Sequence, residues 1–330
     1  MTRHTDRRAR RTVPVSVRTY RDDDLEAIAE LRNAVAAVDQ TADGIVIVEP
    51  PADPACTTTE PHRDAYVVVD KAGHIFGLAQ LQVMTGPQRG FIWAFPVVHP
   101  ERRGTLAERL LLERVGDRAG ELGRQTGSRQ VYFYVHCGSH QTERITLYQS
   151  LGLRALRHRP HMIYAPLASV PLPAIPPAIE VRPYTRGRDE AAAMRTLNEA
   201  FADDWEHTPV TRDDWSAWLG SPEWRADLNL VAADGDDVVG LCLCRINDER
   251  MKWIGRRDGY VDTLCVSPSF QRRGVGRALL LSALAALRRA GMVSATLDTD
   301  EDNPTQAPRF YQQLGFREVW RWVAYGAELR

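Results

Sequence analysis

The sequence predicts an α/β protein made of two successive copies of one unit, and three observations lead to this fold class. The chain has 330 residues, which is more than one hydrophobic core usually absorbs and favours two domains. A proline-rich stretch at residues 166–177 divides the chain nearly in half and disfavours helix or strand there. Residues 147–153 and 310–316 match at a fixed offset of 163 residues, which indicates tandem duplication.

This division gives four segments. Residues 1–14 form a basic tail that we expect to be disordered, and it cannot be a secretory signal because no apolar run follows its arginines. Residues 15–165 are the first domain, residues 166–177 are a stiff linker, and residues 178–330 are the second domain.

Both halves show the same succession of elements. Each opens with a short strand and a run of apolar residues at helical spacing, then continues with two strands joined by a polar turn. In the first half these are residues 15–18, a helix through Leu25, Ile28 and Leu31, and strands at 66–69 and 75–81. In the second half they are residues 179–182, a helix through Ala191, Met194 and Leu197, and strands at 228–232 and 238–244.

The most informative element is a strand, glycine loop and helix at residues 259–290, which a second strand follows at 293–299. Pro268 ends the first strand, and apolar residues recur at helical spacing from Ala278 onward. Gly274 and Gly276 leave backbone N–H groups uncovered beside the positive end of the helix, which suits a phosphate. The loop is neither a Walker loop, since no Gly-Lys-Ser/Thr follows, nor a dinucleotide fingerprint, since Leu279 replaces the third glycine.

Composition excludes several classes of function. The 42 Lys and Arg residues and 43 Asp and Glu residues give a net charge of -1, which provides no global attraction for nucleic acid. No apolar run reaches the ~20 residues that span a bilayer, so we expect no membrane partner. The five cysteines include no Cys-x-x-Cys pair, which argues against a disulfide framework and a metal site and favours a cytoplasmic location.

The second half resembles the GCN5-related N-acetyltransferase (GNAT) superfamily. The resemblance rests on Gln271, Gly274 and Gly276 between a strand and a helix, on the strand that follows, and on the later Tyr311 and Gly315. The duplicated layout is similar to the tandem members of the mycothiol synthase type. This resemblance implies two GNAT-like domains. Each would be a mixed, mostly antiparallel sheet with a central splayed pair of parallel strands, flanked by helices.

By this resemblance the second half binds acetyl-CoA as its acyl donor. In the family, backbone amides of the glycine loop hold the pyrophosphate, and the pantetheine arm lies between the two splayed strands. The implied contacts are amides at the end of the first strand, the loop with its arginines, the first helical turn and one asparagine. They are Leu264, Cys265, Val266, Gln271, Arg272, Arg273, Gly274, Val275, Gly276, Arg277, Ala278 and Asn303. At least one of the three arginines is expected to be a solvated surface residue.

Acetyl transfer to an amine requires two proton transfers, because the ammonium group must lose a proton and the leaving thiolate must gain one. Tyr311 occupies the tyrosine position that many family members place beside the sulfur, and we expect it to be the acid; packing beneath the sheet is the alternative. For the base, Asp298 and Asp262 on the two splayed strands are candidates. An unshifted aspartate, with a pKa of ~3.9, would need burial or an ordered water for this role.

The acceptor is expected to contact Asp204 and Trp205, which lie between the first two helices of the second half. Carboxylates in this segment could hold a cationic amine. The alternative is an acidic helix end with Trp205 packed as an anchor.

The first half keeps the outline of the site and loses its details. Glu101 replaces the counterpart of Gln271 and Leu106 replaces the second glycine, so we expect no productive acetyl-CoA binding there. The sequence therefore predicts an N-acetyltransferase whose second half acetylates a primary amine of a small molecule, without a metal, as a monomer or homodimer. Acetylation of a protein or peptide, and a non-catalytic acyl-CoA-binding module, are the alternative functions.

Overall fold

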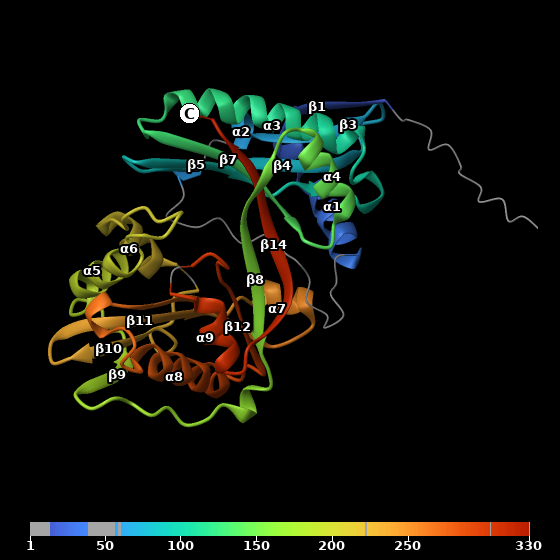
Figure 1. Ribbon diagram of the computed structural model, residues 1–330. Coiled ribbons are helices and arrows are strands. Elements are labelled where there is room, and N and C mark those ends of the chain that lie inside the picture. Colours follow the sequence, from blue (N-terminus) through green and yellow to red (C-terminus); the bar gives the residue numbers. More distant parts are fainter. Residues whose placement is uncertain (1–13, 39–56, 59–60, 222, 304, 330) are drawn as a thin grey trace, which may run out of the picture.

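The computed structural model describes residues 14–38, 57–58, 61–221, 223–303 and 305–329, and strands from both halves join into one sheet (Figure 1). Its strand order is β1-β3-β4-β5-β7-β14-β8-β13-β12-β11-β10-β9, with β2 and β6 paired to β4. All but the last residue of the predicted basic tail lie outside the described residues.

The strands of the first half are β1 Val15–Thr19, β2 Thr57–Thr58, β3 Ala65–Asp70, β4 Ile75–Thr85, β5 Arg89–Ala94, β6 Val97–Val98, β7 Gln130–Gly138 and β8 Arg154–Tyr164. Those of the second half are β9 Ile179–Pro183, β10 Leu230–Asp234, β11 Asp237–Arg245, β12 Asp258–Val266, β13 Ser294–Asp298 and β14 Arg317–Glu328. The helices are α1 Leu25–Val38, α2 Pro61–Asp64, α3 Leu106–Gln125, α4 Thr142–Ser150, α5 Glu190–Ala200, α6 Arg212–Gly220, α7 Asp248–Ile254, α8 Val275–Arg289 and α9 Ala307–Gln313.

The two halves exchange strands, because the last strand of each half completes the sheet of the other half. Strand β8 pairs antiparallel with β13, and β14 pairs antiparallel with β7, so the two long strands cross side by side at the centre of the molecule (Figure 1). The proline-rich stretch therefore divides the chain but not the sheet.

The parallel strands β12 and β13 separate soon after they meet. They pair only at Asp258 with Ser294, Gly259 with Ala295 and Tyr260 with Thr296, and then diverge into a fork. A register shift between β11 and β12 at Leu243 and Cys244 marks a bulge in the diverging part. The corresponding strands of the first half, β5 and β7, stay paired over six positions, from Arg89 to Ala94. The sheet is otherwise mostly antiparallel, which confirms the predicted fold class.

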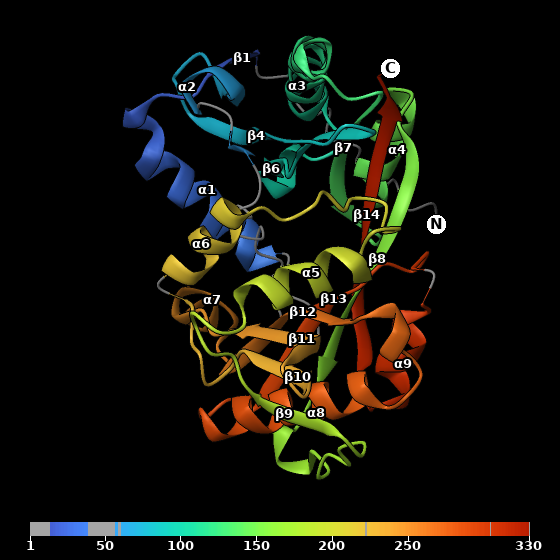
Figure 2. The ribbon, with the colours of Figure 1, turned by 90° about the vertical axis from the view of Figure 1, so that its left-hand side faces the viewer.

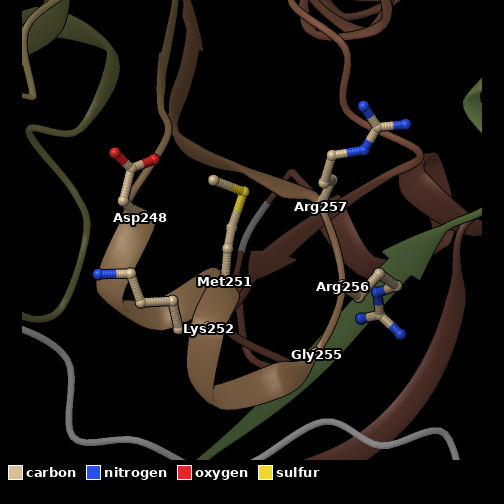
Figure 3. A pocket seen from close by; sticks show the side chains of 6 residues that line it. All are labelled: Asp248, Met251, Lys252, Gly255, Arg256 and Arg257. Carbon is tan, nitrogen blue, oxygen red and sulfur yellow. The ribbon is translucent and has the colours of Figure 1, made fainter.

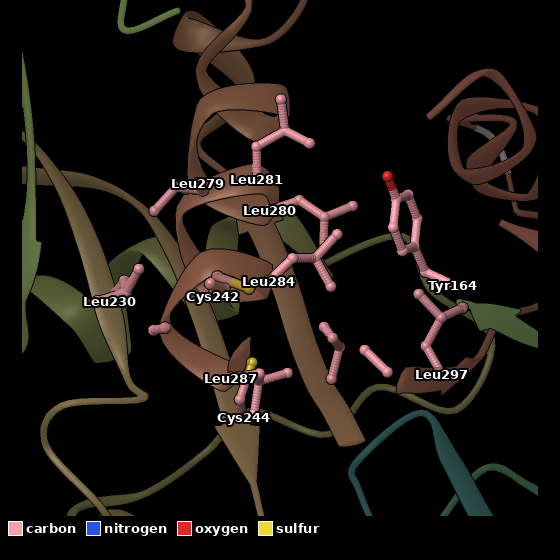
Figure 4. Packing of buried hydrophobic residues seen from close by; sticks show 14 of the residues in the cluster. Tyr164, Leu230, Cys242, Cys244, Leu279, Leu280, Leu281, Leu284, Leu287 and Leu297 are labelled. Atoms are coloured by element: carbon pink, nitrogen blue, oxygen red, sulfur yellow. The ribbon is translucent and has the colours of Figure 1, made fainter. Parts of the chain in front are cut away.

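Helices cover both faces of the second half's sheet (Figure 2). On one face α8 buries Leu279, Leu280, Leu284 and Leu287 against β10 to β13 (Figure 4), because these leucines recur along a single side of the helix. On the other face α5 and α6 bury residues such as Trp215. Helix α3 packs in the same way on the first half's sheet. These two-sided cores fix the fork and the start of α8 relative to each other.

Four of the predicted free cysteines, Cys137, Cys242, Cys244 and Cys265, are buried thiols without disulfides, and Cys56 lies outside the described residues. Among the described helices none is both long and apolar enough to cross a membrane. Within the same ranges, no three His, Cys, Asp or Glu side chains are grouped as a metal site would require.

Candidate active site

The glycine loop of the second half joins the end of β12 to the start of α8. Gly274, the residue that caps α8, has a φ of 84° in the left-handed region that favours glycine, and Arg272 has a φ of 61° there too. The side-chain amide of Gln271 donates a 3.2 Å hydrogen bond to the carbonyl of Val266, which ties the loop to the strand. The glycine at position 274 is thus explained by the left-handed backbone of the loop.

Gly276 lies where strand, loop and α9 converge. A Cβ atom placed on it would be 3.5 Å from the Cγ2 of Val266 and 3.9 Å from the ring of Phe310, which are ordinary contact distances. The protein itself therefore has room for a methyl group at this position. A longer side chain would extend into the space in front of the loop.

The loop provides the donors that an anion needs. The first amides of α8 have no partner within the helix, its first turn contains no acidic residue, and the helix dipole is positive at this end. The side chains of Arg272, Arg273 and Arg277 are exposed around it. Arg273 lies over the ring of Phe270 at 5.1 Å, so this arginine is partly held by packing.

Beyond the fork, β12 has an open edge. Leu264, Cys265 and Val266 pair with β11 on one side, and past Tyr260 no described residue of β13 pairs with the other side. Alternate backbone amides of this stretch consequently face the fork, as an additional strand or an extended ligand would require.

Tyr311 lies on α9 and is 8% exposed. Its ring packs against Phe310 and Phe316 at 5.4 and 5.6 Å, and burial raises the pKa of its phenol. The side chain is therefore a protonated donor at neutral pH. These contacts also match the packing interpretation, because Tyr311 belongs to the core beneath β11 and β12.

Asp298 stands at the end of β13, past the last residue that pairs with β12. Its Oδ1 lies 2.8 Å from the Nδ1 of His161, and its Oδ2 accepts a 2.8 Å hydrogen bond from the hydroxyl of Tyr260. Burial raises the pKa of Asp298, but the charge and hydrogen bond of His161 and the hydrogen bond of Tyr260 outweigh it and lower the pKa overall. Sequence reasoning missed His161 and Tyr260, which belong to no motif.

Two other predicted residues have partners of their own. The carboxylate of Asp262 lies 3.1 Å from Arg245 and is about half exposed, so a cation already balances its charge. The side-chain oxygen of Asn303 accepts a 2.9 Å hydrogen bond from the amide of Thr305, which shapes the turn before α9.

The predicted acceptor segment packs on the first half. The ring of Trp205 lies 5.0 Å from that of Phe91 and 5.6 Å from that of Tyr132, both on first-half strands. The next residue, Glu206, accepts a 2.6 Å hydrogen bond from Tyr134. Burial is the main cause that raises the pKa of Asp300, and the nearby charge of Asp204 raises it further. The segment thus combines an anchoring aromatic residue with carboxylates near the fork.

In the first half, a carboxylate of the chain itself occupies the corresponding loop. Gly104 has a φ of 66°, and its amide donates a 2.8 Å hydrogen bond to the carboxylate of Glu108. Glu108 is fully buried and also binds Arg144 at 2.6 Å and the hydroxyl of Tyr148 at 3.3 Å. Sequence reasoning gave Glu101 and Leu106 as the reasons to expect no acetyl-CoA binding in the first half and did not find this internal carboxylate.

A separate surface pocket of about 370 Å³ lies beside α7 (Figure 3). It is lined by Asp248, Met251, Lys252, Gly255, Arg256 and Arg257. None of the predicted site residues contributes to it.

A splayed parallel pair, a glycine loop capping a helix, and a buried tyrosine beneath the fork define an acyltransferase fold. The model of the acetyltransferase (GNAT) family matches residues 191–316. A mycothiol acetyltransferase of Streptomyces bingchenggensis is 30% identical over 258 residues, which cover 77% of this chain and 78% of that protein. This chain belongs to the GNAT family and is an acetyl-CoA-dependent acetyltransferase.

Solved structures with the same fold are similar over almost the whole chain. A GCN5-related N-acetyltransferase from Sphaerobacter thermophilus has a TM-score of 0.76 at 24% identity, covering 97% of this chain and 98% of that one. A tandem GNAT protein from the clavulanic acid biosynthesis pathway has a TM-score of 0.64 at 16% identity, covering 96% and 99%. The duplicated layout predicted from the sequence is therefore that of tandem GNAT proteins.

Proposed function

We propose that the second half transfers the acetyl group of acetyl-CoA to a primary amine of a small molecule, and that the first half binds no acyl donor. The contrast between the two loops carries this proposal. The loop at Gly274 presents free helix N-terminal amides to an anion, whereas the loop at Gly104 donates its amide to the chain's own Glu108. A second anion at Gly104 would meet a buried negative charge.

In the proposed arrangement the amides of the loop and first turn of α8 bind the diphosphate, and exposed arginines add positive charge. The contacts are those named from the sequence, from Gln271 to Ala278. The open edge of β12 at Leu264, Cys265 and Val266 binds the pantetheine arm and polarises the thioester carbonyl. Asn303 contributes by holding the turn before α9.

The chain's own residues would then supply the proton transfers. Asp298 lies on the proton-accepting side, where its carboxylate can receive a hydrogen from the acceptor's ammonium group. Asp262 is the weaker candidate for this role because Arg245 balances its charge. Tyr311 donates its phenolic proton to the departing thiolate and is reprotonated from solvent afterwards.

The acceptor side is proposed to be the space next to Asp204 and Trp205. The carboxylate of Asp204 can attract an ammonium group, whereas the charge of Asp300 is balanced by Arg157 at 3.5 Å. The name of the Streptomyces relative, a mycothiol acetyltransferase, supports a small-molecule acceptor rather than a protein.

The test is acetyl-CoA consumption by the full-length chain across a panel of small amines, amino sugars and peptides. We expect turnover with at least one small amine and little with peptides, and no turnover in Gly276→Glu. Turnover on peptides alone would contradict the proposed acceptor class. Acetyl-CoA binding without turnover on any member would indicate a non-catalytic module.

A further inference from the structure

His161 belongs to the first half of the chain but lies within the second half's sheet. Strand β8 runs between β13 and β14, and His161 is the register partner of Asp298 on one side and of Trp320 on the other. Register partners on antiparallel strands direct their side chains to the same face. The strand exchange thus brings an imidazole from residue 161 to the carboxylate at the end of the fork.

His161 and Tyr260 hold both oxygens of Asp298. The two hydrogen bonds, each 2.8 Å long, fix the plane of the carboxylate. A carboxylate has about four lone-pair positions, so Asp298 can accept a further hydrogen from a substrate while both partners remain bound.

The other ring nitrogen of His161 is buried without a partner. The side chain is 7% exposed, and its Nε2 makes no hydrogen bond to any described residue. An unsatisfied buried polar atom costs about 1–3 kcal/mol. An apolar residue at this position would avoid the cost, so the imidazole is explained better by its chemistry than by packing.

We infer that His161 is a positioning residue for acetyl transfer: its Nδ1–H donates a hydrogen bond to Asp298 and orients the carboxylate that removes a proton from the acceptor's ammonium group. This inference rests on the proposed function, because it assumes an amine acceptor at the fork. In this step an N–H bond of the ammonium group breaks and its electron pair stays on nitrogen. The proton forms an O–H bond on Asp298, which becomes a carboxylic acid and later releases the proton to solvent, while His161 keeps the hydrogen on its Nδ1.

Burial raises the pKa of Asp298, but the charge and hydrogen bond of His161 and the hydrogen bond of Tyr260 outweigh it and lower the pKa overall. Asp298 is therefore a carboxylate at neutral pH and is able to accept a proton.

The groups around His161 come from every strand packed near it. They are Asp298 on β13, Tyr260 on β12, Arg159 on β8, His136 on β7, Trp320 on β14 at a ring distance of 6.0 Å, and His140 beyond Trp320 at 6.3 Å. Arg159 and Asp298 both act on His136 electrostatically. Burial, reinforced by Arg159, lowers the pKa of His136 well below its usual range, so His136 stays neutral and adds no charge beside Asp298.

The first test compares His161→Ala with His161→Asn in the full-length chain. Alanine removes the donor to Asp298, so we expect turnover to fall by about 10²-fold while acetyl-CoA affinity stays within a few fold. The side-chain amide of asparagine can place an N–H group near the position of Nδ1, so His161→Asn should recover part of the lost turnover. Wild-type turnover in His161→Ala, or equal losses in both variants, would overturn the inference.

The second test does not depend on activity. In protein labelled at histidine, the imidazole signal of His161 is identified by its loss in His161→Ala, and in the wild type it should show a hydrogen on Nδ1. A signal without that hydrogen would overturn the inference, whereas failure of every amine in the panel would overturn only the proposed function.

Discussion

The backbone amide of Gly104 donates a 2.8 Å hydrogen bond to the carboxylate of Glu108, so the first half's loop holds a negative group of the chain itself. Glu108 also binds the buried Arg144 at 2.6 Å. Each of these two buried groups therefore depends on the other, because either one without its partner would be an unpaired buried charge.

Replacing Glu108 by glutamine tests the structural part of this relationship. The change keeps the shape of the side chain and leaves Arg144 as a buried charge without its partner, which should lower the free energy of unfolding by about 3 kcal/mol. Urea denaturation measures this difference. Glu113→Gln is the matched control, because its ion pair with Arg109 is 3.7 Å long and partly exposed to solvent, and it should change stability by less than about 1 kcal/mol. Equal effects of both variants would contradict the assigned role of Glu108.

Tyr311→Phe separates proton donation from packing. The variant removes only the hydroxyl group, so acetyl-CoA affinity should stay within a few fold while turnover falls by about 10²- to 10⁴-fold. Steady-state kinetics and calorimetry measure the two quantities. If packing were the whole role, turnover would stay at the wild-type level and any loss would appear in thermal stability.

The glycine loop could be predicted from its own residues because it is encoded locally, whereas the fork and the role of the tyrosine were predicted from the resemblance to the GNAT family. A left-handed turn requires glycine at position 274, and a helix begins directly after it. The candidate site residues from Leu264 to Ala278 therefore lie in one continuous segment. The duplicated pattern at Tyr148 and Tyr311 predicted the first half's outline in the same way.

The strand exchange could not be predicted, because an alternating strand pattern indicates a strand but not its neighbour. His161 becomes relevant only when β8 pairs with β13, which lies more than a hundred residues later in the chain. The role of Glu108 depends equally on contacts with Arg144 on another helix. The contacts of Trp205 with Phe91 also join distant segments, and for that reason the sequence left its two interpretations open.

The exchange of β8 and β14 between the two halves predicts that the second half does not fold alone. A fragment of residues 178–330 lacks β8, so β13 and β14 would both lose their shared neighbour. We expect it to aggregate or to show no cooperative unfolding, and co-expression with residues 1–177 should restore a soluble complex. A cooperative melting transition in the isolated fragment would contradict this prediction.

Asp189 gives stability a defined dependence on pH. Burial raises its pKa, but two hydrogen bonds from Arg182, at 2.7 and 2.8 Å, and one from the amide of Thr185 outweigh burial and lower the pKa. Because the pKa is lower in the folded state, ionised Asp189 stabilises the protein at pH values above the unfolded pKa of ~3.9. This stabilisation is lost as the pH falls below that value.

Asp189→Asn should therefore be less stable than the wild type at pH 7, and the difference should shrink as pH falls below about 4. Urea denaturation across this range measures it. Asp237→Asn, which affects an exposed pair with Arg195 at 3.1 Å, should show little difference at any pH. A gap for Asp189→Asn that widens at acid pH would contradict the assigned sign.

The central claim is that one half of the chain binds acetyl-CoA, and calorimetric stoichiometry tests it most directly. We predict one site per chain in the wild type and in Gly276→Ala, since a methyl group fits at ordinary contact distances. Gly276→Glu should abolish binding, because it adds bulk and negative charge in front of the loop, and Leu106→Glu on the exposed surface of α3 should leave binding unchanged. Two equivalent sites per chain, or one site that survives in Gly276→Glu, would contradict the account.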